Sequence, residues 1–255
     1  MKVKLIGYQE HALELLLYTK DTRLQGSNSL DDIISWPYDK KMEHYAYMKD
    51  TIKSSFEFAK YTFELKEVSR GFIQQLTRTR TQNYAQESMR AVDVRDANFY
   101  NEGMCEEYDL AVETSVKKYS EMIDGGIQIQ DARGVLPIDT LTSIIVGTDL
   151  RTMHETAKVR LCYRSQGEYQ EVFKRMRDEV AKVHPWAIDM INVACVDSGI
   201  CCFPRYTECP IQDFTVKVSA AKKLAIQIAW DLNTHQANPV AINGVTMKWV
   251  HYNNK

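Results

Sequence analysis

The 255-residue sequence has no long run of apolar residues. Near the N-terminus the apolar run is about four residues long, too short for the apolar segment of a secretion signal or for a membrane-spanning helix. No later stretch approaches the length of a membrane span. We therefore expect a soluble, cytoplasmic protein with no membrane partner, located in the host cytoplasm if the source is viral.

The sequence also lacks an excess of charge of either sign. Its 32 Lys and Arg residues face 34 Asp and Glu residues, which gives a formal net charge of -2. So small a charge produces no overall field that would attract a nucleic-acid backbone or an anionic membrane. Any anion site must therefore be local, and we expect no nucleic-acid partner.

The cysteines are not spread as a disulfide framework would be, which favours a reducing compartment. Four of the six fall within residues 195–209, namely Cys195, Cys201, Cys202 and Cys209. With His184 they would supply enough ligands for one tetrahedral zinc, but the closely paired spacing typical of zinc sites is missing. Buried thiols or a disulfide are favoured, and we expect no metal.

Hydrophobic periodicity predicts a mixture of strands and longer helices. Strands are predicted at residues 3–8, 56–65 and 141–146. Helices are predicted at residues 10–20, 39–52, 69–77, 102–122, around 130, 149–160, 165–183 and 220–232, with a turn at 243–244. Ser69 and Asp149 are expected to cap two of these helices, and Gly125 and Gly126 to end a third. The mixture indicates an α+β or α/β fold, with a sheet flanked by helices in a single domain spanning residues 1–255.

The densest polar chemistry lies between residues 77 and 90, where Arg78, Arg80 and Arg90 occur among hydroxyl and amide side chains. If this segment is extended, Arg78 and Arg80 point from one face, and their guanidinium groups suit phosphate oxygens, with Ser88 nearby. The alternative is a solvent-exposed edge strand whose arginines discourage pairing with another edge. Nucleic-acid binding is a third possibility, which the balanced net charge disfavours.

This segment resembles the signature of flavin-dependent thymidylate synthases, R-H-R followed by seven residues and then S-x-R. Here it reads Arg78-Thr79-Arg80, seven residues, Ser88 and Arg90. Further elements occur in the family's order: Phe56-Glu57, Gln75, ARGVLP at 132–137, Asp149-Leu150-Arg151, Arg160, and Gln166 with Glu168. Together they cover about residues 50–175, and their joint order is more specific than any single motif.

The resemblance implies a homotetramer with FAD at subunit interfaces, which modifies C5 of dUMP using methylenetetrahydrofolate and NADPH. The implied dUMP contacts are Gln75, Arg78, Gln86, Glu87, Ser88, Met89, Arg90, Arg133 and Arg160. The implied FAD contacts are Arg78, Thr79, Arg80, Gln86, Asp149, Arg151 and Glu155. Arg160 is the implied catalytic residue, because its fixed positive charge would stabilise an anion on the uracil. The alternative for each arginine is a surface ion pair, and for Asp149 and Glu155 it is helix capping.

The sequence departs from the family's pattern mainly on the flavin and folate side. Thr79, Ile52 and Phe58 stand where the family has histidines, Ala91 replaces a tyrosine, and residues 22–25 match the N-terminal A-R-x-S element poorly. We expect reductive methylation to dTMP, with formation of 5-hydroxymethyl-dUMP as an alternative. A second alternative is a non-catalytic nucleotide- or RNA-binding paralogue. Residues 185–255 lie outside the resemblance and form an extension of unknown role.

Overall fold

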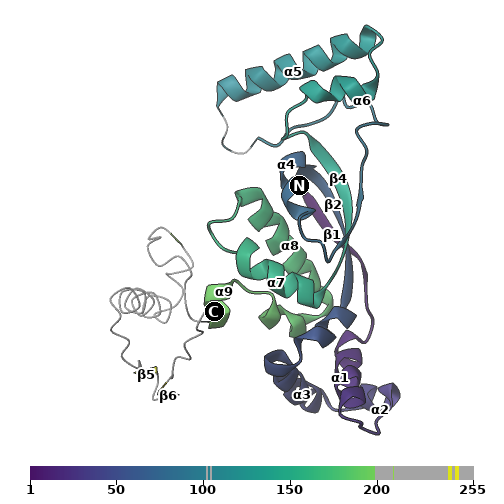
Figure 1. Cartoon of the computed structure of the whole chain (residues 1–255), viewed down its shortest axis with the longest axis vertical. Helices are drawn as coiled ribbons and strands as arrows, with labels where there is room; N and C mark the ends of the chain where they lie inside the picture. Colours follow the sequence, from purple (N-terminus) through teal and green to yellow (C-terminus); the bar gives the residue numbers. More distant parts are fainter. Residues whose placement is uncertain (102, 104, 199–208, 210–240, 243–244, 247–255) are drawn as a thin grey trace, which may run out of the picture. The chain divides into compact units, whose positions relative to one another are not determined.

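The computed structural model describes residues 1–101, 103, 105–198, 209, 241–242 and 245–246 (Figure 1). The chain divides into two compact units, Met1–Val193 and Ala194–Lys255. In the second unit the described elements are α9 (Ala194–Ser198) and an antiparallel pair, β5 (Ala241–Ile242) and β6 (Val245–Thr246). The helix predicted at 220–232, the turn at 243–244, and Cys201 and Cys202 lie outside the described residues. Among the described residues no helix is long and apolar enough to cross a membrane.

A four-stranded antiparallel sheet forms the centre of the first unit. Its strands lie in the order β1 (Lys2–Tyr8), β2 (Lys60–Ser69), β4 (Leu141–Asp149) and β3 (Asn83–Gln86). Side chains alternate across a strand, and in β2 the buried face carries Tyr61, Phe63 and Leu65. The antiparallel sheet flanked by helices confirms the predicted α+β class.

Helices bury the apolar face of this sheet. Phe72 of α4 (Arg70–Leu76), Met153 of α7 (Leu150–Arg160) and Phe173 of α8 (Gly167–Val183) join Phe63 and Val146 in one core. One end of the unit carries α1 (Ala12–Arg23), α2 (Leu30–Ile34), α3 (Tyr38–Thr51) and the 3-10 helix η1 (Lys53–Phe58) (Figure 1). The other end carries α5 (Glu106–Asp124) and α6 (Ile129–Ala132), followed by η2 (Arg133–Val135); η3 (Pro185–Met190) follows α8.

Local capping sets the ends of the helices that matter for the site. Ser69 Oγ accepts a hydrogen bond from the Phe72 amide at 2.9 Å, and Asp149 Oδ1 accepts one from the Thr152 amide at 2.8 Å. These bonds satisfy amides that have no partner inside the helix. At the end of α5, Gly126 takes a positive φ of 83°, a conformation that favours glycine. The three predicted boundaries are confirmed.

Two local predictions are wrong. Residues 56–58 belong to the 3-10 helix η1, and β2 begins only at Lys60. Phe56 is buried in the core and Phe58 is half-exposed, so the aromatic character of Phe56 serves tertiary packing and not strand alternation. Residues 77–81 form a turn, and the strand begins at Asn83, so the period-two argument for Arg78 and Arg80 fails.

Candidate functional site

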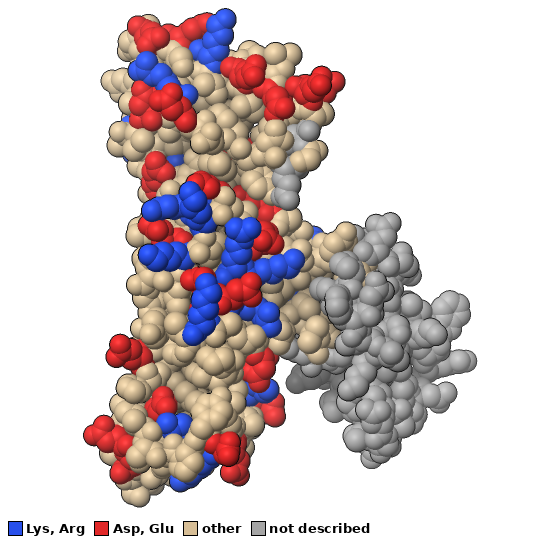
Figure 2. Space-filling model, turned by 180° about the vertical axis from the view of Figure 1, so that it is seen from behind, with Lys and Arg blue, Asp and Glu red and all other residues tan. Residues whose placement is uncertain are grey.

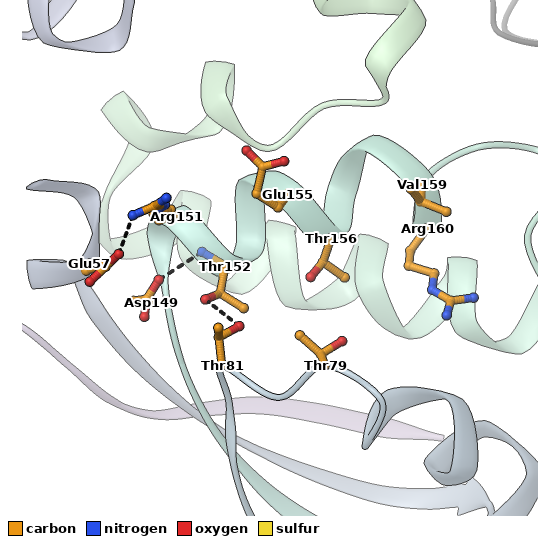
Figure 3. Close-up of a pocket in the computed structure, with 10 residues that line it drawn as sticks. All are labelled: Glu57, Thr79, Thr81, Asp149, Arg151, Thr152, Glu155, Thr156, Val159 and Arg160. Carbon is orange, nitrogen blue, oxygen red and sulfur yellow. Dashed lines mark hydrogen bonds and ion pairs between the residues drawn. The ribbon is translucent and has the colours of Figure 1, made fainter. Parts of the chain in front are cut away.

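A cavity of about 740 Å³ lies where the turn at residues 77–81 faces α7 (Figure 3). Its volume falls in the range of cofactor and small-molecule sites. Glu57 of η1 contributes one side, and Thr79 and Thr81 contribute another. The remaining lining comes from one face of α7 and its cap: Asp149, Arg151, Thr152, Glu155, Thr156, Val159 and Arg160. Residues three and four apart share a helix face, so the periodicity of α7 places these side chains together.

Hydrogen bonds fix the turn before any ligand binds. The Tyr84 hydroxyl lies 2.9 Å from the carbonyl oxygen of Thr79 and 2.7 Å from Gln82 Oε1. Burial raises the pKa of Tyr84, which keeps this hydroxyl a donor. Thr152 Oγ1 donates to Thr81 Oγ1 at 3.1 Å, which joins the turn to the start of α7. The turn is therefore preorganised from both sides.

Arg78 and Arg80 project from this turn and are exposed. Within the described chain neither makes an ion pair, whereas Arg95 pairs with both Asp93 and Asp124. Free guanidinium groups on a rigid turn suit phosphate oxygens, which they bind through two donors at once. The alternative role for Arg78 and Arg80 was a surface ion pair. Among the described residues neither arginine forms one.

Arg160, the last residue of α7, is oriented by neutral groups. Its Nη1 donates to Gln75 Oε1 at 3.1 Å, and its guanidinium carbon lies 4.3 Å from the centre of the Tyr169 ring. Gln75 is held in turn by Gln166, whose Oε1 accepts from Gln75 Nε2 at 2.5 Å. In the part of the chain that the structure describes, no carboxylate pairs with Arg160, so its positive charge remains available to a ligand.

The carboxylates of the cavity are already paired. The pairs are Asp149 with Lys60 at 3.3 Å, Glu57 with Arg151 at 2.5 Å, and Glu155 with Lys158 at 2.8 Å. Burial acts to raise the pKa of Glu155, but the hydrogen bond from Lys158 and its charge outweigh burial and lower it. Asp149 is buried and caps α7, so capping is the role its contacts show. With its acids neutralised, the cavity keeps the positive charge of Arg160.

A second group of basic residues lies at the far end of β3, and we call it the strand-end cluster: Arg70, Ser88, Arg90 and Arg133. Arg133 Nε donates to the carbonyl oxygen of Gln130 at 3.1 Å, and Arg90 Nη2 lies 3.5 Å from Gln130 Oε1. Arg90 and Arg133 make no ion pair with a described residue. Ser88 is exposed beside them.

Arg70 is a site residue that the sequence argument missed. Its Nη2 donates to the carbonyl oxygen of Glu87 at 3.1 Å, while its buried Nε has no partner in the described chain. Burial lowers the pKa of Arg70; the Glu87 charge opposes this shift, and the nearby Arg133 adds to it. The sequence did carry a signal for Arg70. A cation in the first turn of a helix interacts unfavourably with the helix dipole, so an arginine at this position indicates a role other than stabilising the helix.

The remaining predicted residues also lie near this far end. Gln86 is exposed on β3, paired with Ile144, whereas Met89 is almost fully buried. Glu87 Oε2 accepts from the Ser143 amide at 3.1 Å, beside a hollow of about 320 Å³ that both residues line.

The structure therefore divides the predicted dUMP residues, together with Arg80 from the predicted FAD set, into two places. We call Gln75, Arg78, Arg80 and Arg160 the turn cluster. The run from Thr81 to Ser88 separates the two clusters along β3, whereas on α4 Arg70 and Gln75 lie five residues apart, roughly 7.5 Å along the helix axis. Figure 2 shows from behind that Lys and Arg side chains gather over the middle of the first unit. This concentration of positive charge is confined to one region, which agrees with the small net charge of the whole chain.

Together, the fold and the two clusters define an α+β protein suited to phosphate-bearing ligands. A family model described as thymidylate synthase complementing protein matches residues 4–186. The chain therefore belongs to this family, and it is an enzyme of the flavin-dependent thymidylate synthase type. The family resemblance in the sequence is confirmed.

Relatives and solved structures agree with this assignment. The flavin-dependent thymidylate synthase of Pyrococcus horikoshii is 30% identical over 227 residues, covering 79% of this chain and 89% of the relative. That of Sulfolobus acidocaldarius is 26% identical, covering 77% and 78%. The fold is similar to thymidylate synthase X from Helicobacter pylori, solved with FAD and dUMP, at a TM-score of 0.63 and 18% identity, covering 75% of this chain and 99% of that one. It is also similar to a UMP/dUMP methylase from Streptomyces cacaoi, at a TM-score of 0.62 and 18% identity, covering 74% and 93%.

Proposed function

We propose that this enzyme uses FAD and methylenetetrahydrofolate to modify C5 of dUMP, with NADPH as reductant and dTMP as product. The observation that carries the proposal is the turn cluster: Arg160 lines a cofactor-sized cavity, Arg78 and Arg80 flank its lining residue Thr79 in sequence, and none of the three has an acidic partner among the described residues. The relative from Helicobacter pylori, which has this fold, was solved with both FAD and dUMP. Family membership supports the same cofactor for this chain.

The cavity residues fit an anionic dinucleotide such as FAD. Arg78 and Arg80 would hold phosphate oxygens, and the hydroxyls of Thr79, Thr81 and Thr152 add donors along the same wall. Arg151 and Glu155 would border the cofactor, with Arg151 already fixed by Glu57. When bound, the flavin supplies hydride-transfer chemistry. Asp149 contributes by holding the first turn of α7.

The strand-end cluster fits the phosphate of dUMP. Arg90, Arg133 and Ser88 would bind its oxygens, and we add Arg70, whose unpartnered Nε is a donor without an acceptor. Gln86, Glu87 and Met89 would line the same end of β3. Arg160 and Gln75 would face the uracil, where the fixed charge of Arg160 stabilises the negative charge that develops during substitution at C5.

We expect each active site to be shared between subunits, as the family resemblance implies. In a homotetramer, the turn cluster of one subunit would meet the strand-end cluster of another. Such shared sites explain why the arginines of both clusters lack acidic partners in the single chain.

Subunit mixing tests this arrangement. Arg90→Ala and Arg160→Ala are each expected to be inactive, because each removes one half of every site. Co-expressed in equal amounts, the two variants should recover about a quarter of wild-type activity, since random pairing leaves that share of shared sites intact. Activity that stays at the level of the separate variants would place both residues in one chain and overturn the shared site.

The reaction itself is tested by identifying the nucleotide product by mass spectrometry. The protein is incubated with dUMP and methylenetetrahydrofolate, with and without NADPH. We expect dTMP only when NADPH is present. The alternative product is 5-hydroxymethyl-dUMP. It is suggested by the loss of three family histidines, which are replaced here by Thr79, Ile52 and Phe58. A purified protein that is yellow, with flavin absorbance bleached by NADPH, would rule out the non-catalytic alternative.

A further inference from the structure

Tyr169 supports Arg160 from inside the protein. It lies in the first turn of α8 and is fully buried. One face of its ring lies 4.3 Å from the guanidinium carbon of Arg160, and Phe72 of α4 packs against it at 5.0 Å between ring centres, with the rings inclined at 68°. The ring is thus fixed by the core and presents a flat surface to Arg160.

This stacking also affects the orientation of the guanidinium group, because Arg160 has few other restraints among the described residues. It stands at the end of α7, and its one described side-chain hydrogen bond goes to Gln75. A guanidinium group stacks favourably on an aromatic face. The ring would set the plane of the guanidinium group, while Gln75 would set its rotation within that plane. Neither contact neutralises the charge.

The Tyr169 hydroxyl is unusual for a core position. It is buried and has no hydrogen-bond partner of good geometry in the described chain. Burial raises its pKa, and the neighbouring Arg160 and Thr79 side chains offset part of the rise. An unpaired buried hydroxyl is unfavourable, and a phenylalanine would fill the same space without that cost. The core alone gives no reason for a tyrosine here.

We propose that Tyr169 is a positioning residue for Arg160, with its ring fixing the plane of the guanidinium group. The functional part of this inference rests on the proposed role of Arg160 toward uracil. The structural part, that Tyr169 fixes the orientation of Arg160, does not depend on that role.

Two variants and a matched control test the proposal. Tyr169→Leu removes the ring, and Tyr169→Phe removes only the hydroxyl. Phe173→Leu is the control, because Phe173 lies one turn further along α8, is equally buried in the same core and does not stack on Arg160. FAD affinity, Tm, and kcat and KM for dUMP are measured for each variant.

Tyr169→Leu should lower kcat/KM for dUMP about tenfold, as expected for losing a desolvated cation–π contact, with FAD affinity unchanged. Tyr169→Phe keeps the ring and should therefore retain most of the wild-type kcat/KM for dUMP. Phe173→Leu should lower Tm as much as Tyr169→Leu while leaving kcat/KM near wild type. Equal losses of kcat/KM in Tyr169→Leu and Phe173→Leu, or an unchanged kcat/KM in Tyr169→Leu, would overturn the functional part.

Crystal structures of wild type, Tyr169→Leu and Phe173→Leu give a readout that needs no turnover. Arg160 should lose its single orientation in Tyr169→Leu and keep it in Phe173→Leu. If Arg160 is unchanged in Tyr169→Leu, the positioning role is wrong, whatever the enzyme does with dUMP. If Arg160 moves as expected but wild type does not convert dUMP, the proposed function fails and the positioning role stands.

Discussion

The turn cluster and the strand-end cluster lie at opposite ends of β3, and they differ in how far one chain completes them. In the turn cluster, hydrogen bonds fix the backbone, the nearby acids are paired, and Gln75 and Tyr169 orient Arg160. In the strand-end cluster, Arg70 keeps a buried donor unpaired and lies near a second cation, Arg133. The difference teaches that one chain preorganises the turn cluster, whereas in the strand-end cluster it leaves a buried donor without an acceptor among the described residues.

The largest expected effect is at Arg160. Arg160→Ala should lower kcat by about 100-fold or more, because it removes a preorganised charge where negative charge develops. FAD binding, measured by flavin absorbance after dialysis, should be unchanged.

Arg175→Ala is the matched control, since Arg175 is an exposed arginine of α8 paired with Glu171. Its kcat should equal that of wild type. An Arg160→Ala enzyme with normal turnover would refute the proposed role.

The next largest effect separates the two clusters through Arg70. Arg70→Met should weaken dUMP binding by about 1.5–3 kcal/mol, the value of a hydrogen bond to a charged group. FAD affinity should remain as in wild type, because Arg70 lies away from the cavity. Calorimetric titration with dUMP and with FAD checks both values. Equal weakening of the two ligands would mean that the clusters are not distinct.

A smaller effect is expected at the turn. Tyr84→Phe removes the hydroxyl that lies against the Thr79 carbonyl oxygen and should weaken FAD binding by about 0.5–1.5 kcal/mol. Binding of dUMP phosphate should change less. The control is Tyr47→Phe, which alters an exposed hydroxyl of α3 and should leave FAD affinity unchanged. Should both variants bind FAD alike, the turn is not held by Tyr84.

The smallest effect on FAD affinity is expected at Asp149, and it tests whether Asp149 caps a helix or contacts the cofactor. Asp149→Asn keeps a capping oxygen and should leave stability and FAD affinity nearly unchanged. Asp149→Ala removes the cap and should lower the free energy of unfolding by about 0.5–2 kcal/mol. Thermal unfolding and flavin titration distinguish the roles. Weaker FAD binding in Asp149→Asn at unchanged stability would show that the carboxylate itself contacts FAD.

Much of the fold was predictable because its signals are local. Ser69 and Asp149 cap helices through amides only three residues away, and Gly126 ends α5 by its own backbone conformation. The order of the arginine motifs was enough to identify the family, because spacing along the chain survives divergence. Which of the predicted residues contact dUMP and FAD stays a prediction.

The sequence by itself determined the three helix ends set by Ser69, Asp149 and Gly126, the α+β class and which arginines are present. Tertiary structure alone decided that Phe56 packs in a 3-10 helix, that Arg78 sits on a turn, and that Arg70 joins the strand-end cluster. Arg160 meets Gln75 across 85 positions of sequence. Periodicity and capping act within a few residues, whereas the packing of α4 and α8 beside α7 brings distant side chains together, and no local pattern encodes that contact.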